Sequence, residues 1–390
     1  MARGSIRKCS RQDGVSYEVV VDLGPDPVTG KRRQRTRRFK TKREAQAGLT
    51  EWLAEIDKGT AVDRSRQTVS DLLEYWMEAY ARHNVRATTL EGYGYTINRH
   101  IIPSLGSIPL QKLTPAHLQQ FYADKLASGC GPRVVQLCHL RLRQALAMAE
   151  KLGLVARNVA DVVAAPRVPH NEMQTWSVEE AQAFLAVAKE SHYGPIWLVA
   201  MNTGMRRGEL LGLRWQDIDW GNGVLHVRQA VVMLHGKPTI QAPKSRSAHR
   251  VIPLEGPVIE ALREHRTRQN ERRLALGAAW HDHQLVFPSE IGTPVNARNL
   301  DREYRVLISR AGVSPIRIHD IRHTFVTLAL ASGSNLKALS ELLGHAKTSI
   351  TMDLYAHAQT GERRAVVAGV GKLIRGETNE VVRDVFVSVD

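Results

Sequence analysis

The sequence predicts a multidomain chain: a small α+β domain, an all-α bundle, and a mainly α domain that holds a small antiparallel sheet. Three observations support this division. With 390 residues, the chain is long enough for two or three domains with their own cores. Strand and helix patterns share its first part, helical patterns fill its middle, and both kinds return in its last part. We place the domains at residues 1–63, 64–168 and 169–375, followed by a tail at 376–390.

The first domain combines strand patterns, a helix and a strongly basic segment. Residues 17–23 are typical of a strand, and a turn rich in Gly, Pro and Asp follows. Nine of the thirteen residues from Lys31 to Arg43 are basic and none is acidic, and arginines at every second position suit a strand. Thr41 is expected to cap a helix that runs through Ile56. Such a unit can lay its sheet in a DNA groove; a disordered basic tail is the alternative.

The second domain shows only helical patterns. Apolar residues are spaced for one helical face within 69–80, 89–101, 115–126 and 134–152. Thr114 followed by a proline is a typical helix start. The fourth helix carries several basic residues, which predicts a bundle with a basic face. A segment at 163–174 holds two prolines and no periodicity, and is expected to be a linker.

The third domain mixes helices with short strands. Ser177 followed three residues later by Glu180 predicts a capped helix start. A buried helix is expected at 196–201. Strands are expected at 224–233 and 282–288, with a further strand at 239–254 that a loop interrupts.

Composition narrows the classes of partner. The net charge of +15 favours a polyanion. No apolar run approaches the roughly 18 residues of a spanning helix, and no secretory signal opens the chain, so nucleic acid is favoured over a membrane and cytoplasmic residence is expected. Cys9, Cys130 and Cys138 are too few and too scattered for a disulfide framework or a zinc site. His281 and His283 form an HxH without further ligands, so a surface loop is expected there.

Near the end of the chain, several side chains suited to phosphate chemistry are grouped. His319 and Arg322 stand three apart and share one helical face. A second helix ends just before His345, and a third, starting at 348–349, would carry Tyr355. Taken singly, a histidine at a helix end or a lone tyrosine is usually structural. As a set, they suit holding a phosphate and attacking it with a phenolic oxygen.

The motifs HxxRH at 319–323 and LGH at 343–345, with Tyr355 after them and TGMRRGEL at 203–210 before them, resemble the tyrosine recombinase (phage integrase) family. The resemblance implies the DNA breaking-rejoining enzyme fold for residues 169–375. The middle domain resembles the SAM-like core-binding domain of this family. The first domain resembles its arm-binding domain, a three-stranded sheet with one helix.

The resemblance also implies which residues react. The six matching positions are Arg206, Lys244, His319, Arg322, His345 and Tyr355. The two arginines would neutralise the non-bridging phosphate oxygens, because the guanidinium fork matches phosphate and stays charged. Lys244 would be the general acid and His319 the base or proton shuttle. His345 would hydrogen-bond the phosphate, and Tyr355 would be the nucleophile.

Some neighbouring residues leave alternatives open. Arg207 competes with Arg206, although the TGxR spacing favours Arg206. Arg246 shares the loop of Lys244 and is the alternative acid. His323 is turned about 100° from Arg322 along the helix and is interpreted as structural. Glu209 is expected to pair with an arginine or with the helix itself, which would orient the site.

The function that the resemblance implies is site-specific DNA recombination through a 3′-phosphotyrosyl link, without ATP, metal or another cofactor. The basic first domain favours an integrase of a phage or integrative element over a chromosome-resolving recombinase. The alternatives are a type IB topoisomerase-like enzyme and a non-catalytic DNA-binding protein. The presence of all six matching catalytic positions argues against the non-catalytic protein.

The implied partners are double-stranded DNA attachment sites bound by a homotetramer on two sites. A host DNA-bending protein and an excisionase are candidate accessory partners, and association with the nucleoid is expected on DNA. The residues expected to bind DNA are basic ones in the first two domains: Lys31, Arg32, Arg33, Arg35, Arg37, Arg38, Lys40, Arg141 and Arg143.

Overall fold

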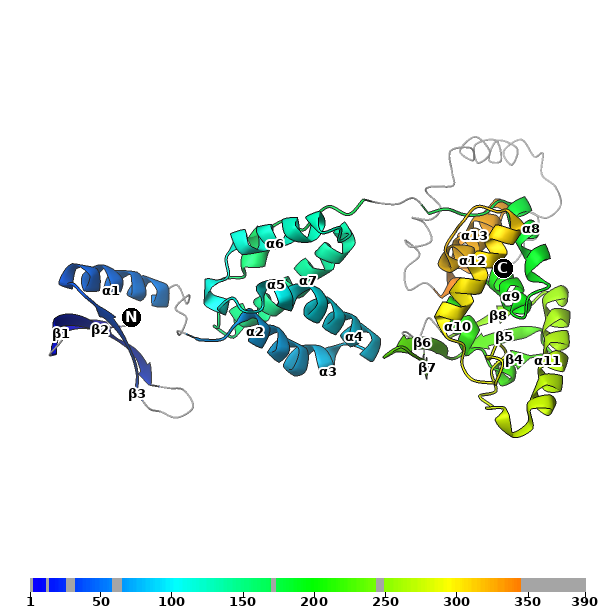
Figure 1. The fold of residues 1–390 in the computed structure, drawn as a ribbon, viewed down its shortest axis with the longest axis horizontal. Helices are drawn as coiled ribbons and strands as arrows, with labels where there is room; N and C mark the ends of the chain where they lie inside the picture. The colour runs from blue at the N-terminus through cyan, green and yellow to red at the C-terminus, as the bar shows by residue number, and fades with distance from the viewer. Residues whose placement is uncertain are drawn as a thin grey trace, which may run out of the picture. The chain divides into compact units, whose positions relative to one another are not determined.

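The computed structural model describes residues 3–11, 14–25, 32–57, 65–169, 173–242 and 249–344. The chain divides into two compact units, Met1–His170 and Asn171–Asp390. Figure 1 shows the elements of each unit. The predicted positions Lys31, Lys244, Arg246, His345 and Tyr355 lie outside the described residues, as does the helix expected from residue 348.

The amino-terminal domain is a three-stranded antiparallel sheet with one helix against it (Figure 1). Its strands are β1 (Arg3–Arg11), β2 (Gly14–Pro25) and β3 (Arg32–Phe39), in that order, and its helix is α1 (Lys42–Asp57). Val19 and Val21 of β2 pack against Leu49 and Trp52 of α1. The Thr41 hydroxyl accepts a hydrogen bond from the Glu44 amide at 3.2 Å. The predicted small α+β fold of this domain is confirmed.

The next part of the first unit is helical throughout. One continuous helical run consists of α2 (Val69–Trp76), a π turn (Met77–Ala81) and α3 (Arg82–Asn84). A second run consists of α4 (Ala87–Thr96), a π turn (Ile97–Ile101) and α5 (Ile102–Leu105). After these come a 3₁₀ turn (Leu110–Lys112), α6 (Pro115–Ala127), α7 (Pro132–Lys151) and a 3₁₀ turn (Val159–Val162). Trp76, Leu118 and Leu142 lie in their shared core. Thr114 is the N-cap of α6, as the sequence predicts.

The second unit packs helices around a small sheet (Figure 1). Its helices are α8 (Val178–Ala188), α9 (Gly194–Thr203), α10 (Arg207–Gly212), α11 (Gly256–Leu276), α12 (Ala297–Ala311), α13 (Ile318–Ala331) and α14 (Leu336–Leu343), with 3₁₀ turns at Trp215–Asp217 and Gly277–Ala279. The sheet has the order β4-β5-β8, formed by β4 (Ile218–Asp219), β5 (Val224–Val227) and β8 (Arg250–Pro253). A separate hairpin pairs β6 (Ala230–Leu234) with β7 (Lys237–Gln241).

Two strand predictions in this unit need correction. The strand expected at 224–233 is two strands, because β5 ends at Val227 and pairs with β8, whereas β6 pairs with β7. The strand expected at 282–288 does not form. Gln284 has φ 58, a left-handed conformation that interrupts an extended run, and the segment makes only two isolated bridges, from Leu285 to Arg214 and from Pro288 to Pro294.

Among the described residues, no helix is long and apolar enough to cross a membrane. That part of the chain also holds no group of three or more His, Cys, Asp or Glu that could bind a metal ion. His281 and His283 are exposed and lie outside helices and strands.

Candidate active site

A left-handed glycine starts the site. Gly204 follows α9 with φ 59, and the chain then turns so that Arg206 becomes the N-cap of α10. A Cβ on this glycine would lie 2.6 Å from Cδ1 of Phe325, so a larger residue would collide with α13 as well as strain the backbone. The turn thus brings the start of α10 against α13.

The centre of the site is the buried carboxylate of Glu209. It accepts hydrogen bonds from the Arg206 amide at 2.9 Å and from Nη1 of Arg206 at 2.8 Å. Nη1 and Nη2 of Arg250 donate to the same two oxygens at 3.2 and 2.8 Å. Burial alone would raise the pKa of Glu209, but the bonds and charges of Arg250 and Arg206 outweigh it and lower the pKa. Glu209 is therefore ionised at neutral pH.

A third arginine approaches from α13. Arg322 is only 3% exposed, and its Nη1 and Nη2 donate to the carbonyls of Gly204 and Leu343, both at 2.7 Å. Burial lowers the pKa of Arg322, and the neighbouring charges of Arg206 and Arg250 lower it further. Arg322 thereby joins the turn before α10 to the last turn of α14.

The arginines of the site suit an anion. In the described part of the chain, Arg206 and Arg250 bond to the carboxylate of Glu209, and Arg322 lies close enough for its charge to interact with theirs. Guanidinium groups gathered in this way attract anions, because each stays charged at neutral pH. The Arg206 side chain is 39% exposed, so it can reach a ligand from solvent. A phosphodiester fits both the charge and the fork geometry of arginine.

His319 lies on the first turn of α13, three residues before Arg322. Nearby protein atoms displace part of the water around the His319 ring, which lowers its pKa although the side chain reaches the surface, and the charge of Arg322 acts in the same direction. The ring of His323 packs edge-on against it with the centroids 4.9 Å apart, and burial lowers the pKa of His323 to about 4. His319 is exposed while the side chain of His323 is only 12% exposed, so His319 is the imidazole available to a substrate.

The basic residues expected to bind DNA lie on different surfaces. In β3, Arg37 pairs across the sheet with the fully buried Val19, so it faces α1, and its guanidinium lies 4.4 Å from the Trp52 ring. Arg38 lies on the face that α1 leaves uncovered, 3.1 Å from Glu18.

Other residues of that prediction have separate environments. Arg35 lies on the same face of β3 as Arg37, and Lys40 is exposed beyond the strand. In α7, the guanidinium of Arg141 lies 3.8 Å from the Tyr93 ring. Arg143 pairs with Asp161 at 2.6 Å. Arg32 and Arg33 belong to β3.

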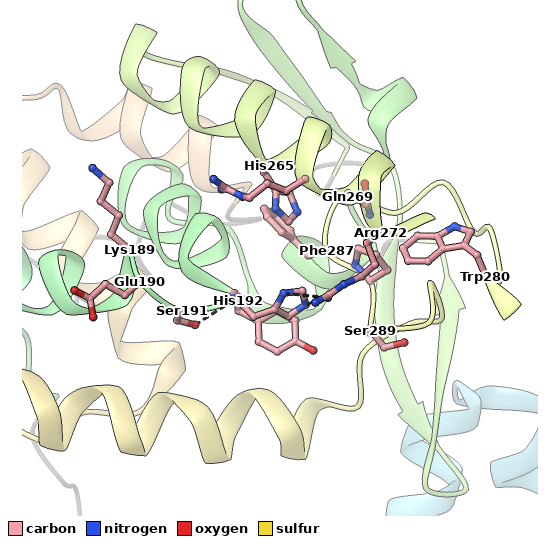
Figure 2. Close-up of a pocket in the computed structure, with 13 residues that line it drawn as sticks. Lys189, Glu190, Ser191, His192, His265, Gln269, Arg272, Trp280, Phe287 and Ser289 are labelled. Carbon is pink, nitrogen blue, oxygen red and sulfur yellow. Dashed lines mark hydrogen bonds between the residues drawn. The ribbon is translucent and has the colours of Figure 1, made fainter. Parts of the chain in front are cut away.

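A cavity of about 340 Å³ lies elsewhere in the second unit, between α11 and the loop that joins α8 to α9. Figure 2 shows Arg272 pointing at the His192 ring, whose nitrogens lie 3.2 and 3.3 Å from Nη1. The described residues that line the cavity include none of the six predicted catalytic positions. The cavity is therefore separate from the arginine cluster.

Comparisons with known proteins agree with this geometry. Residues 174–362 match the model of the phage integrase family, residues 68–126 that of the phage integrase N-terminal SAM-like domain, and residues 5–56 that of the arm DNA-binding domain. The chain is 31% identical over 360 residues to a tyrosine recombinase XerC-like protein of Caldanaerobacter subterraneus subsp. tengcongensis, covering 87% of this chain and 92% of that protein. This chain belongs to the phage integrase family of tyrosine recombinases. It is a site-specific recombinase that cuts and rejoins DNA.

Two solved structures share the fold of this recombinase. The Tn1549 transposon integrase in complex with transposon right end DNA has a TM-score of 0.67 at 21% identity, over 78% of this chain and 100% of that one. A lambda integrase tetramer bound to a Holliday junction has a TM-score of 0.56 at 19% identity, over 89% and 94% of the two chains. They confirm the predicted fold class for the recombinase, including a mainly α catalytic domain with a small antiparallel sheet.

Three of the six predicted positions meet in the described part of the recombinase. Arg206 and Arg322 contact the same cluster, and His319 lies beside it. Described segments next to two of the other positions contact this cluster: β8, which begins six residues after Lys244, supplies Arg250, and α14, which ends two residues before His345, supplies the carbonyls of its last two residues.

Arg250 is not among the site residues that the sequence predicts. A signal was present: Arg250 precedes the buried Ile252 by two residues in β8, so it occupies a core-facing position of that strand. A charged residue at such a position almost always has a buried partner. The partner, Glu209, lies 41 residues earlier in the sequence.

The environment of His319 predicts its titration. We expect the His319 imidazole of the free protein to titrate below its ordinary pKa of 6.5 and to be mainly neutral at that pH, because the partial loss of water around the ring and the charge of Arg322 disfavour the imidazolium. A ¹⁵N NMR titration, with His319→Gln to assign the signal, measures this midpoint. A midpoint at or above 6.5 would contradict the arrangement of charges described here.

Proposed function

We propose that the cluster around Glu209 holds the scissile phosphate of a DNA strand and that Tyr355 attacks it. The Tyr355 oxygen forms a bond to phosphorus, and the bond from phosphorus to the 5′ oxygen breaks, which leaves a 3′-phosphotyrosyl link and a free 5′ hydroxyl. The reaction keeps the number of phosphoester bonds constant, so the 5′ hydroxyl of a partner strand can reseal the link without ATP. The gathering of Arg206, Arg250 and Arg322 around Glu209, with the Arg206 side chain 39% exposed, is the observation that carries the proposal.

Each further residue has one task. Arg206 and Arg322 neutralise charge on the non-bridging oxygens as the transition state forms. Neutral His319 accepts a proton from the attacking tyrosine, consistent with its lowered pKa. Lys244 donates a proton to the leaving 5′ oxygen. His345 hydrogen-bonds the phosphate.

We further propose that the recombinase integrates a phage or mobile element into DNA. The arm-domain match at residues 5–56 and the likeness to a transposon integrase support this substrate class. The expected assembly is a homotetramer on two double-stranded attachment sites, supported by the lambda integrase tetramer on a Holliday junction. Residues 1–63 would bind arm sites, residues 64–168 and 169–375 would bind and cut core sites, and 376–390 would be a tail. A host DNA-bending protein and an excisionase would assist.

The nucleophile can be tested directly. Tyr355→Phe removes only the attacking oxygen, so it should abolish the covalent protein–DNA band on a suicide substrate while core-site affinity stays close to wild type. A denaturing gel and a gel-shift titration measure the two properties. Tyr193→Phe is the matched control, because it removes the same hydroxyl from a tyrosine that lines the separate cavity. A covalent band from Tyr355→Phe would sink the assignment.

The general acid can be identified by changing the leaving group of the DNA strand. Lys244→Ala should slow cleavage of an ordinary strand but should recover on a strand with a bridging 5′ sulfur, because a thiolate leaves without a proton. Arg246→Ala serves as the comparison on both substrates. If the sulfur restores Arg246→Ala and leaves Lys244→Ala slow, Arg246 is the acid.

The amino-terminal domain should add affinity for separate arm sites. Deleting residues 1–63 should preserve cleavage of short core sites but remove arm-site protection, because the basic segment no longer neutralises phosphates. Each phosphate contact contributes about 0.9 to the slope of log K against log salt, so the truncated protein should show a shallower slope. Footprinting at several salt concentrations decides this. Identical protection and slope for both proteins would rule out an arm-binding role.

A further inference from the structure

Arg250 occupies a junction of three segments of the site. It is the first residue of β8, six residues after Lys244 in the sequence, and its side chain is only 5% exposed. Two of its nitrogens donate to Glu209 on α10, and its Nε donates to the carbonyl of Leu342 at 2.6 Å. One guanidinium thus connects β8, α10 and the last turn of α14.

Arg206 and Arg250 bond to both carboxylate oxygens of Glu209. Oε1 of Glu209 accepts from Nη1 of Arg206 and Nη1 of Arg250, and Oε2 accepts from the Arg206 amide and Nη2 of Arg250. The fork of Arg250 therefore fixes the plane of the carboxylate. The guanidinium of Arg206, which is 39% exposed, bonds to one oxygen of this carboxylate.

We propose that Arg250 is a positioning residue for the recombination reaction: it holds Glu209 so that Arg206 meets the scissile phosphate, and it ties the end of α14 to the same carboxylate. This inference rests on the proposed function, since it assigns the phosphate to Arg206. In the described part of the chain, Arg250 contacts Glu209 and the carbonyl of Leu342, and it acts on the phosphate through Arg206.

General stability alone is a weaker reason for this arrangement. A buried ion pair often adds little net stability compared with apolar residues of the same volume. A lysine would keep the charge but lacks the planar fork that donates to both carboxylate oxygens and to the carbonyl of Leu342 at once. The geometry of the bonds is the feature that only arginine supplies.

A matched pair of variants separates positioning from stability. Arg250→Gln leaves Glu209 with Arg206 as its partner. Arg214→Gln breaks a comparable bidentate pair in the same unit, 2.8 and 3.0 Å long, and leaves the 1%-exposed Asp217 with Arg228 at 3.5 Å. Urea unfolding, core-site affinity and single-turnover cleavage of a suicide substrate are measured for both.

We expect Arg250→Gln to slow cleavage by about 10- to 100-fold, as small misplacements of catalytic groups do, with core-site affinity nearly unchanged. Arg214→Gln should lower the urea midpoint of unfolding about as much as Arg250→Gln does, but it should cleave at the wild-type rate. Arg250→Lys should recover part of the stability and little of the rate. If Arg250→Gln and Arg214→Gln have the same stability and cleave at the same rate, the inference is overturned.

A second comparison uses the background of Arg206→Lys, which keeps a charge but lacks the fork. If Arg250 acts through Arg206, adding Arg250→Gln to this variant should cause a much smaller further loss than it causes alone. A full additional loss would show that Arg250 acts independently, and the inference would fail. If Arg206→Lys and Arg206→Ala both cleave at the wild-type rate, Arg206 does not bind the phosphate. That result would contradict the proposed function itself, not only the role of Arg250.

Discussion

The site depends on one buried carboxylate shared by two arginines. Glu209 receives four hydrogen bonds, from the amide and guanidinium of Arg206 and from the fork of Arg250. A carboxylate so deeply buried keeps its charge only because these partners outweigh the loss of water. Arg322 adds a third guanidinium beside the two that bond to Glu209. The cluster forms from the protein's own residues and leaves the Arg206 side chain 39% exposed to solvent.

The surrounding fold provides what this cluster needs. The left-handed Gly204 turns the chain into α10 and offers its carbonyl to Arg322. The last turn of α14 offers the carbonyls of Leu342 and Leu343, which have no partner within their own helix, to Arg250 and Arg322. The start of β8, which follows Lys244 in the sequence, and the end of α14, which precedes His345, are thereby anchored to a single set of charges. Catalysis by positioned cations requires this kind of fixed frame.

Local features of the sequence predicted local features of the structure. Thr41, Thr114 and Ser177 cap helices as expected, because a cap needs only partners within three residues. Arg206, His319 and Arg322 were found from motif spacing and family resemblance. The strand expected at 282–288 was wrong because an apolar run can be buried as an irregular segment, and nothing local marks the left-handed Gln284. Arg250 was missed as a functional residue because its partners lie on α10 and α14, which the sequence does not place beside β8.

The central claim is that the arginines stabilise negative charge on the scissile phosphate. Single-turnover cleavage by wild type and Arg322→Ala, on suicide substrates with either a phosphodiester or a neutral methylphosphonate at the scissile position, tests it most directly. On the phosphodiester, Arg322→Ala should lose about 10²–10³ in rate, the usual effect of removing one such donor. On the methylphosphonate, most of that loss should disappear, because the charge that Arg322 neutralises is absent. An equal loss on both substrates would contradict the account and leave Arg322 a structural link between α9, α13 and α14.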